Sequence, residues 1–325
     1  MSEFSLLKQK LPGVRRGVPL KDHTTFKIGG PAKYFCVAKK SSDIAKAVAA
    51  ARRLKIHFFI LGTGSNVLAP DNGFPGLVIK IQNTAYKIPL DSARGKQTTR
   101  VWAEAGVSMA ALVRETGKRG LAGLEWAGGL PGTVGGAVRG NAGAFGGEIK
   151  DSIVRVEAVD EKGKRRTFSR KECKFGYRSS IFKEKNFIVL SASFKLEKGN
   201  KKEIQAAARD HIRYRKERHP LEYPNAGSIF KNCDLAKVPK ALRKEMQDVI
   251  KVDPFPVIPT AALIARAKLQ GLRVGDVQVS EKHPNYMVNL GNARTKDVLR
   301  LIANVKKRIK KKFGVDLEEE ISFPH

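Results

Sequence analysis

The alternation of hydrophobic and polar positions predicts a mixture of helices and strands in the first 120 residues. Residues 44–54 have the spacing of an amphipathic helix, and Ser42-Asp43 in front of it is expected to be its cap. Two apolar runs follow, at 57–61 and 76–80, and each is typical of a buried strand. Residues 99–105 predict another strand, and 108–118 another helix.

The rest of the chain predicts an antiparallel region followed by helices. Short alternating runs indicate strands at 153–158, 166–168 and 187–196, and helical spacing indicates helices at 202–218, 239–249, 259–267 and 295–313, with an extended end at 317–323. The polar segment KGNKK, at 198–202, is a candidate domain boundary.

The stretch 123–149 interrupts these patterns because ten of its 27 residues are glycine, a third of all the glycines in the chain. Flexible linkers are rich in Ser, Thr and charge, whereas this stretch carries Trp126, Leu130, Val134 and Phe145. Glycine is used where a backbone takes positive φ or lies directly against a ligand. We therefore expect a buried loop system around a large cofactor, with Asn141 at a position that tolerates left-handed backbone.

Composition narrows the classes of protein. The chain has 325 residues, 42% of them hydrophobic, which suffices for two or three domains with real cores. Its net charge of +31 raises nucleic acid as a partner, but the basic residues are spread along the chain, apart from the cluster at 306–312, and no nucleic-acid-binding motif accompanies them.

The same composition bears on location and metals. The three cysteines are far apart and form no metal-binding or disulfide pattern. No apolar segment has the length of a signal peptide core or a membrane span. We expect a cytoplasmic protein that binds no metal.

Several stretches carry chemistry that is weak when each is taken alone. Residues 62–66 (GTGSN) lack the third glycine of a dinucleotide fingerprint, yet their backbone N–H groups could bind a pyrophosphate; a plain turn explains them as well. Residues 175–180 place Tyr177 beside Arg178. Ser228 follows a glycine but lacks the surroundings of a nucleophile, and the acidic run 318–320 reads by itself as a solvated tail.

Together these stretches resemble the UDP-N-acetylenolpyruvoylglucosamine reductase family. The resemblance covers nearly the whole chain, and its segments stand in the family's order: TTFKIGGPA, LGTGSNVLAPDNGFPGLVI, GLPGTVGGA with NAGAFGGEI, ECKFGYRSSIFK, PNAGSIFKN and VSEKHPNYMVN. No insertion separates SSIFK from the strand at 187–196, so the chain resembles the shorter subtype.

The resemblance implies an α+β fold. Two subdomains, 1–82 and 83–201, would form an FAD-binding module of the vanillyl-alcohol-oxidase type, and an α/β domain at 202–315 would bind the substrate, with 316–325 returning to the active site. The implied reaction is the reduction of UDP-N-acetylglucosamine enolpyruvate to UDP-N-acetylmuramate for peptidoglycan synthesis. FAD would be bound non-covalently, NADPH would be the co-substrate, and the protein would be a monomer with no specific nucleic-acid or membrane partner.

The resemblance also assigns residues. The catalytic arginine, proton-donating serine and catalytic glutamate of the family fall on Arg178, Ser228 and Glu320. The family's proline before that glutamate is replaced here by Glu319, which leaves open which of the two acids faces the site.

The matched cofactor and substrate positions complete the predicted site. Those for FAD are Gly62, Thr63, Gly64, Ser65, Asn66, Leu130, Pro131, Gly132, Thr133, Gly135, Gly136, Asn141, Gly143, Gly147 and Ile149. Those for the substrate are Tyr177, Arg218, Asn225, Lys231, Asn232 and His283.

Two other functions remain open from the residues alone. An oxidase on the same FAD module would often tether its flavin through a histidine, and none of the six histidines lies in either glycine-rich loop. A basic nucleic-acid-binding protein without catalysis would contain no flavin and would bind DNA in a strongly salt-dependent manner.

Overall fold

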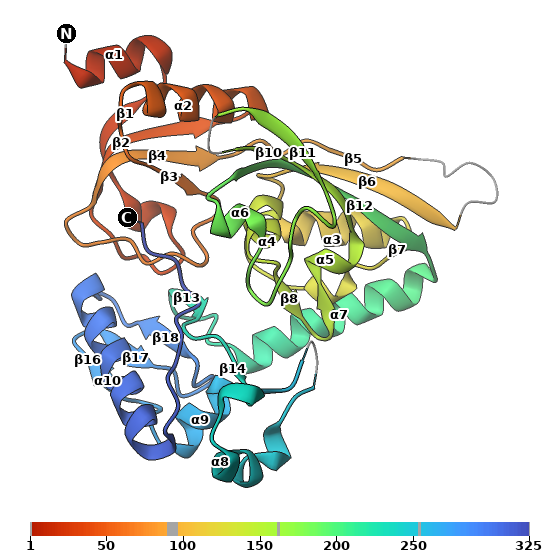
Figure 1. Ribbon diagram of the computed structural model, residues 1–325, viewed down its shortest axis with the longest axis vertical. Helices are drawn as coiled ribbons and strands as arrows, with labels where there is room; N and C mark the ends of the chain where they lie inside the picture. The colour runs from red at the N-terminus through yellow and green to blue at the C-terminus, as the bar shows by residue number, and fades with distance from the viewer. Residues whose placement is uncertain (1, 90–96, 161–162, 253–254, 325) are drawn as a thin grey trace. The chain divides into compact units, whose positions relative to one another are not determined.

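The computed structural model describes residues 2–89, 97–160, 163–252 and 255–324. Its contacts divide the chain into two units (Figure 1). Unit 1 consists of Met1–Val18, Ala32–Thr63 and Pro75–Arg215; unit 2 consists of Pro19–Pro31, Gly64–Phe74 and Lys216–His325. Each unit has its own hydrophobic core.

The first sheet has four strands in the order β1-β2-β4-β3. The strands are β1 (Arg15–Pro19), β2 (Pro31–Ala38), β4 (Phe74–Ile81) and β3 (Phe58–Leu61), and the helices beside them are α1 (Glu3–Lys10) and α2 (Ser41–Arg53). Strands β3 and β4 are parallel, which confirms the predicted helix–strand–strand segment.

The start of α2 corrects one prediction. Lys40 occupies the N-cap position. The Asp43 carboxylate accepts hydrogen bonds from the backbone N–H groups of Lys39 and Lys40, at 3.1 and 2.9 Å. Asp43 therefore satisfies the helix start as expected, whereas Ser42 is already inside the first turn.

The second sheet of unit 1 is antiparallel, as predicted, in the order β11-β10-β12-β6-β5 with β7 also paired to β12. Its strands are β5 (Tyr86–Lys87), β6 (Thr98–Glu104), β7 (Leu121–Ala122), β10 (Ile153–Val159), β11 (Arg165–Ser169) and β12 (Ile188–Lys198). The short helix α6 (Ile181–Glu184) precedes β12.

The glycine-rich stretch folds into short elements against this sheet. They are η2 (Glu125–Ala127), α4 (Val134–Arg139), β8 (Gly143–Ala144), β9 (Gly147–Glu148) and α5 (Ile149–Ser152). Val134 and Val138 are completely buried and Trp126 nearly so, and α4 packs on β12. The stretch is therefore part of the core, not a linker.

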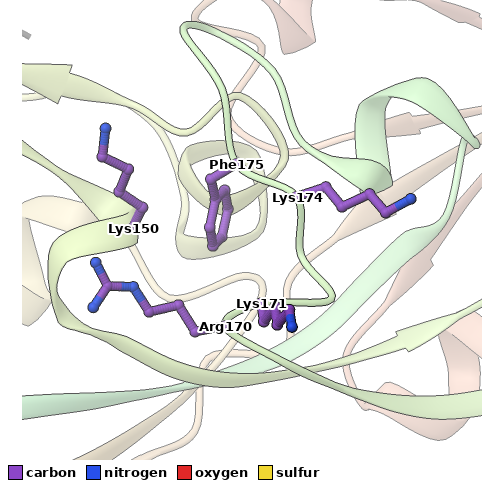
Figure 2. Close-up of a pocket in the computed structure, with 5 residues that line it drawn as sticks. All are labelled: Lys150, Arg170, Lys171, Lys174 and Phe175. Atoms are coloured by element: carbon purple, nitrogen blue, oxygen red, sulfur yellow. The ribbon is translucent and has the colours of Figure 1, made fainter.

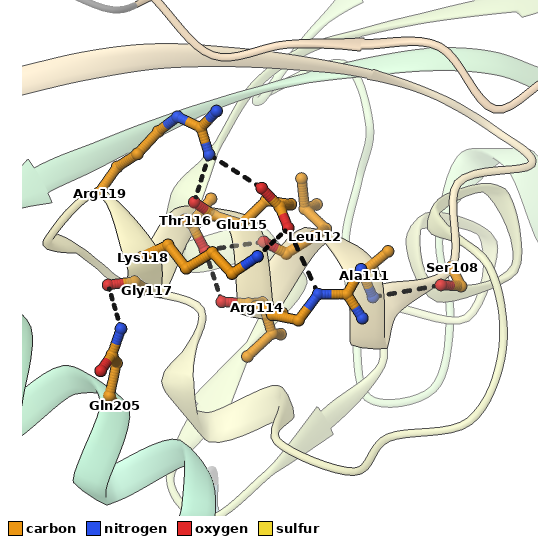
Figure 3. Close-up of polar contacts among 11 residues, drawn as sticks. Ser108, Ala111, Leu112, Arg114, Glu115, Thr116, Gly117, Lys118, Arg119 and Gln205 are labelled. Atoms are coloured by element: carbon orange, nitrogen blue, oxygen red, sulfur yellow. Dashed lines mark hydrogen bonds and ion pairs between the residues drawn. The ribbon is translucent and has the colours of Figure 1, made fainter.

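Helix α3 (Met109–Lys118) is secured at both ends (Figure 3). At its start the Ser108 hydroxyl accepts a hydrogen bond from the Ala111 N–H. Near its end Glu115 binds Lys118 and Arg119 on the following turn, both at 3.1 Å, as well as Arg114. These bonds, that of Lys118 foremost, lower the pKa of Glu115 to about 2. Helix α7 (Lys201–Arg218) joins α3 through the Gln205 side chain, which donates to the Gly117 carbonyl.

Unit 2 contains a four-stranded antiparallel sheet in the order β13-β18-β17-β16 and a two-stranded sheet of β14 and β15. These strands are β13 (Asn225–Ser228), β14 (Cys233–Asp234), β15 (Val257–Ile258), β16 (Arg273–Val274), β17 (Val277–Val279) and β18 (Tyr286–Asn289). The helices are η1 (Leu20–His23), η3 (Leu235–Lys237), α8 (Lys240–Glu245), η4 (Gln247–Val249), α9 (Thr260–Arg266) and α10 (Thr295–Phe313).

Helix α10 has the predicted bounds, and its apolar face contacts β16 and β17. The predicted helix 239–249 is instead the short α8 followed by the 3-10 turn η4. The chain end is extended as predicted, since Glu319 and Ser322 form isolated bridges with Phe230 and Val67.

The three-domain division stays a prediction. Contacts place both predicted FAD subdomains largely in unit 1, but the segments 19–31 and 64–74 group with the chain's second half. Residues 62–66, predicted to act together, therefore straddle the boundary between the units.

Candidate functional site

Arg178 lies on a tight turn of unit 1 between β11 and α6. Gly176 and Ser179 close the turn with reciprocal backbone hydrogen bonds of 3.0 and 3.2 Å. Arg178 itself has φ +53°, a left-handed conformation that is uncommon for a residue with a branched or long side chain. Such strain persists only where the surroundings enforce it, and it concentrates at functional sites.

Two contacts illustrate how the guanidinium of Arg178 is positioned. Its Nη2 donates to the Gly143 carbonyl at 2.9 Å, and its Cζ lies 5.1 Å from the centre of the Tyr177 ring. Lys183 of α6 holds the backbone of the same residue by donating to the Arg178 carbonyl. Arg178, Tyr177 and the 143–149 segment thus converge within unit 1.

Glycines of the 143–149 segment allow close packing. A Cβ on Gly143 would meet Glu148 Cγ at 2.7 Å and Arg178 Nη1 at 3.4 Å, and a Cβ on Gly147 would meet the Trp126 ring at 2.4 Å. Ile149 is completely buried. The protein's own packing therefore requires glycine at 143 and 147 and an apolar side chain at 149.

Asn141 has the left-handed backbone expected of it, with φ +42°, and its side chain is completely buried. Its amide nitrogen donates to the Gly176 carbonyl at 3.0 Å and to Glu148 at 3.2 Å, and its amide oxygen accepts from the Lys150 N–H at 3.0 Å. The side chain is therefore engaged with the protein, and only the backbone of Asn141 remains for contact with a cofactor.

Two predicted FAD loops meet in unit 1. A Cβ on Gly62, which follows β3, would lie 3.0 Å from Oγ1 of Thr133 at the start of α4. Around Gly136 a Cβ would meet only the Thr133 side chain, at 3.7 Å, so this first turn of α4 has a bare surface. The two glycines therefore flank the Thr133 hydroxyl, which caps α4 by accepting from the Gly136 N–H at 3.4 Å.

The other predicted FAD residues of α4 and the turn before it serve the fold as well. The Gly132 carbonyl accepts from the Met109 N–H at 3.1 Å, and the Gly135 N–H donates to the Ala105 carbonyl at 2.9 Å. Gly132 has φ +118°. Leu130 and Pro131 lie in the turn that leads into Gly132, and Thr63 is the last residue of its segment of unit 1.

In unit 2 the 64–66 segment contacts the chain's end. Gly64 has φ +73°, and a Cβ there would lie 2.4 Å from the His23 carbonyl oxygen. Ser65 follows it, and the Asn66 amide donates to the Glu320 carbonyl at 3.2 Å. A predicted cofactor residue and a predicted catalytic residue are therefore neighbours in this unit.

Ser228 is the last residue of β13 and pairs with Tyr286 of β18. The next residue links it to the chain end, because the Glu320 N–H donates to the Ile229 carbonyl at 2.8 Å. Ser228 and Glu320, predicted to act together from positions 92 residues apart in sequence, are brought to one place in unit 2.

Residues of the acidic run 318–320 differ in the partners of their side chains. Glu319 binds Lys306 of α10 at 2.9 Å, and Glu318 binds Lys231 at 3.0 Å. Glu319 pairs with α10, whereas the Glu320 backbone bonds to the segment after Ser228, and the choice of Glu320 as the catalytic acid stays a prediction.

The predicted substrate residues are spread over both units. Asn225, Lys231, Asn232 and His283 belong to unit 2, as does Arg218, exposed at the end of α7; Tyr177 belongs to unit 1. The amide of Asn225 already donates to the Tyr223 carbonyl at 2.9 Å, and the Asn232 side-chain oxygen accepts from the Thr260 N–H. Burial lowers the pKa of His283 to about 4, so its ring is neutral at physiological pH.

Four supporting residues were not predicted from sequence. Asn285 binds both backbone groups of Phe230, donating to its carbonyl at 2.8 Å and accepting from its N–H at 3.1 Å. His219 and Tyr286 share a hydrogen bond of 3.0 Å. Glu148 is buried with one carboxylate oxygen unpartnered in the described part of the chain. In the sequence, the signal that could have found these residues is that each is a polar residue close to a predicted site motif.

A surface hollow of about 470 Å³ lies beside the Arg178 turn (Figure 2). Its lining residues are Lys150, Arg170, Lys171, Lys174 and Phe175. Figure 2 shows Lys174 directed away from Lys150 and Arg170, so the cations do not converge on one point. None of the predicted site residues is among those that line it.

Two features are absent from the residues that the structure describes. No group of three or more His, Cys, Asp or Glu side chains is arranged to hold a metal ion. Within the same described ranges, no helix has both the length and the apolar character needed to cross a membrane.

Comparison with protein families gives two matches. Residues 219–324 match the C-terminal domain of UDP-N-acetylenolpyruvoylglucosamine reductase, and residues 32–169 match an FAD binding domain. The two matched regions contain every predicted catalytic residue except Arg178, which lies between them.

Individual relatives agree along nearly the whole chain. UDP-N-acetylenolpyruvoylglucosamine reductase of Caldanaerobacter subterraneus subsp. tengcongensis is 40% identical over 93% of this chain and 91% of its own. That of Carboxydothermus hydrogenoformans is 39% identical over 97% of this chain and 95% of its own. The crystal structure of the Thermus caldophilus reductase superposes with a TM-score of 0.71 at 32% identity, covering 95% of this chain and 98% of that one.

Proposed function

We infer the roles of individual residues from the premise that this chain belongs to the UDP-N-acetylenolpyruvoylglucosamine reductase family. It is an oxidoreductase with an α+β fold and an FAD-binding domain. It reduces UDP-N-acetylglucosamine enolpyruvate to UDP-N-acetylmuramate, with NADPH as co-substrate, in peptidoglycan synthesis.

The residues present fit FAD. Gly62 and Gly136 flank Thr133 with bare backbone, and in our proposal they hold the cofactor's phosphates together with the rest of the predicted FAD set, to which Asn141 contributes only its backbone. The chemistry that FAD supplies when bound is hydride transfer, from NADPH to the enolpyruvyl group. We propose that it is bound non-covalently, so acid denaturation should release free flavin; flavin that stays with the precipitated chain would indicate the tethered oxidase instead.

Arg178 and Glu320 act in the proposal on the substrate carboxylate. Addition of hydride at C3 leaves negative charge at C2, which spreads into that carboxylate. A fixed guanidinium donates to it, and a protonated Glu320 donates a second hydrogen bond. One preorganised donor of this kind typically contributes ~3–4 kcal/mol to transition-state stabilisation. The bond from Arg178 to the Gly143 carbonyl restricts the guanidinium before substrate arrives.

Ser228 is proposed to deliver the proton to C2. An alcohol is a very weak acid, so it serves only a strongly basic acceptor, and the carbanion or enol at C2 is one. The observation that carries this role is the backbone bond from Glu320 to Ile229, which places the donor segment and the glutamate together in unit 2. Tyr177 has the more acidic hydroxyl and is the competing donor.

The remaining substrate contacts follow from charge. Arg218 and Lys231 supply cations for the pyrophosphate, with Asn225, Asn232, His283 and Tyr177 completing the predicted set. A monomer located in the cytoplasm, with no specific nucleic-acid partner, is the form that we propose.

To test these roles, flavin reduction by NADPH and reduction of the enolpyruvyl substrate are measured separately in Ser228→Ala and Tyr177→Phe. Flavin reduction by NADPH, followed by visible absorbance, should be normal in both. Formation of the muramate product should fall by roughly 10²–10⁴-fold in Ser228→Ala, the usual contribution of a general acid, and much less in Tyr177→Phe. Normal turnover in Ser228→Ala with a dead Tyr177→Phe would transfer the role to Tyr177.

A further inference from the structure

Among the contacts that hold the turn carrying Arg178, one comes from a completely buried side chain. The backbone of the turn is strained at Lys174 and Arg178, with φ of +45° and +53°, and its own two closing bonds join only Gly176 and Ser179. Asn141, from the glycine-rich stretch, donates from its amide nitrogen to the Gly176 carbonyl at 3.0 Å. This bond fixes the turn from outside.

Asn141 is itself held by the segment that binds the guanidinium. Its amide nitrogen also binds Glu148, and its oxygen accepts from the Lys150 N–H. Lys150 Nζ lies 2.5 Å from the same Glu148 oxygen. Two residues after Asn141, the Gly143 carbonyl accepts from Arg178 Nη2. One short segment therefore holds both the backbone and the side chain of the arginine.

We propose that Asn141 is a positioning residue for Arg178, acting in the substrate-reducing half-reaction and not through FAD binding. The proposal rests on the proposed role of Arg178. Burial makes the arrangement effective, since Asn141 is completely buried and Glu148 nearly so, and hydrogen bonds in such surroundings are not exchanged for bonds to water. Asparagine also suits the φ of +42° at this position, which few other residues adopt readily.

The substitution Asn141→Asp tests the bond to Gly176. It preserves shape, backbone preference and the oxygen that accepts from Lys150, but an ionised carboxylate cannot donate to the Gly176 carbonyl and repels Glu148. FAD content and flavin reduction by NADPH should stay within twofold of the parent protein. Reoxidation by the enolpyruvyl substrate should slow at least tenfold.

A pH profile distinguishes positioning from general damage. A protonated carboxyl group donates a hydrogen bond again, so reoxidation in Asn141→Asp, relative to the parent protein at each pH, should recover as the pH falls. Amide hydrogen exchange of the peptide containing 174–180 should be faster in Asn141→Asp at neutral pH. Failure to recover on acidification would overturn the proposal, and a second buried asparagine separates the lost bond from the general cost of a buried charge.

Asn83 provides a matched control in the same unit. It too is completely buried, its amide nitrogen donates to Ser41 and to the Leu190 carbonyl, and its oxygen accepts from the Gly106 N–H. Asn83→Asp should lower the melting temperature comparably but leave the reoxidation rate and exchange at 174–180 unchanged. Equal slowing in both variants would overturn the proposal.

Other outcomes are equally decisive. Loss of FAD from Asn141→Asp would place Asn141 in the cofactor site instead, as the sequence resemblance suggests, and would overturn the positioning role. The variant Arg178→Gln tests the premise separately: normal reoxidation there would remove the proposed function of Arg178, whatever Asn141→Asp does.

Discussion

Adjacent residues of the acidic run have different surroundings. The Glu319 carboxylate is paired with Lys306 of α10. The Glu320 backbone instead donates from its N–H to the Ile229 carbonyl and accepts the Asn66 amide at its own carbonyl. Sequence alone could not choose between two neighbouring acids at the position where the family has proline and glutamate. The ion pair of Glu319 with Lys306 is the structural difference from which we propose the catalytic role for Glu320.

The pair Glu319→Gln and Glu320→Gln turns this difference into a prediction. Loss of the Glu320 carboxyl should slow reduction of the enolpyruvyl substrate by roughly 10²–10³-fold, the usual effect of removing one preorganised donor, with flavin reduction by NADPH unchanged. Glu319→Gln removes only a part-exposed ion pair, so its kinetics should match those of the parent protein. Stopped-flow measurement of both half-reactions checks this, and slow reoxidation confined to Glu319→Gln would reverse the assignment.

At the scale of elements, the segment 280–285 before β18 places His283 against His219 and against Tyr286, the first residue of β18. The ring centres of His219 and His283 are 5.1 Å apart, and Tyr286 bonds to His219. Burial is the main cause that lowers the pKa of His283 to about 4, and the charge of Lys251 adds to it. Neutral His283 is therefore part of the folded arrangement of this segment.

This gives unit 2 a defined acid sensitivity. The unfolded chain binds a proton at His283 below about pH 6.5, whereas the folded chain does so only near pH 4. The contribution of neutral His283 to the free energy of unfolding is therefore fully present above pH 6.5. It is lost as the pH falls towards 4, by up to ~1.4 kcal/mol per pH unit. The free energy of unfolding, measured by denaturant titration at several pH values, should change less with pH in His283→Gln than in the parent protein between pH 6.5 and 4. An equal pH dependence in the two proteins would contradict the lowered pKa.

Helix α3 shows a charge cluster with a different consequence. Glu115 joins three cations on the surface of the helix, which lowers its pKa to about 2. Its contribution to stability is present above about pH 4.5 and is lost as the pH falls towards 2. The His283 window lies at higher pH, so the two effects are separable in one titration.

At the scale of the whole molecule, the net charge of +31 has no counterpart in the proposed chemistry. Several ion pairs among the described residues, such as Lys33–Glu3, Arg213–Asp210 and Lys310–Asp316, are exposed, and such pairs contribute little to stability. The excess of cations instead predicts non-specific binding to polyanions. The logarithm of the binding constant should fall linearly with the logarithm of the salt concentration.

We expect nucleic acid to accompany the protein at low salt and to be removed by about 200 mM salt, without loss of kcat. The ratio of absorbance due to nucleic acid and to flavin, measured across a salt series, checks the first part, and NADPH oxidation with saturating substrate checks the second. A kcat that disappears when nucleic acid is stripped would contradict the view that the charge is unrelated to catalysis.

Sequence patterns determined the elements that depend on local information. Helix α10 has the predicted bounds because its apolar period and its C-terminal glycine, Gly314 with φ +70°, are both local. The antiparallel strands around β12 followed from alternation in the same way. The order of family motifs determined the reaction, since chemistry of this kind requires particular residues at particular places along the chain.

Tertiary structure decided what depends on distant contacts. Segments 19–31 and 64–74 group with the second half of the chain because they pack on its residues, as Thr295 does on Asp71. Asn141 was predicted to contact FAD, which stays a prediction for its backbone, and the structure shows its side chain donating to the Gly176 carbonyl. A side-chain amide can serve a ligand or the protein with the same atoms, and only the partners within hydrogen-bonding distance distinguish the two uses.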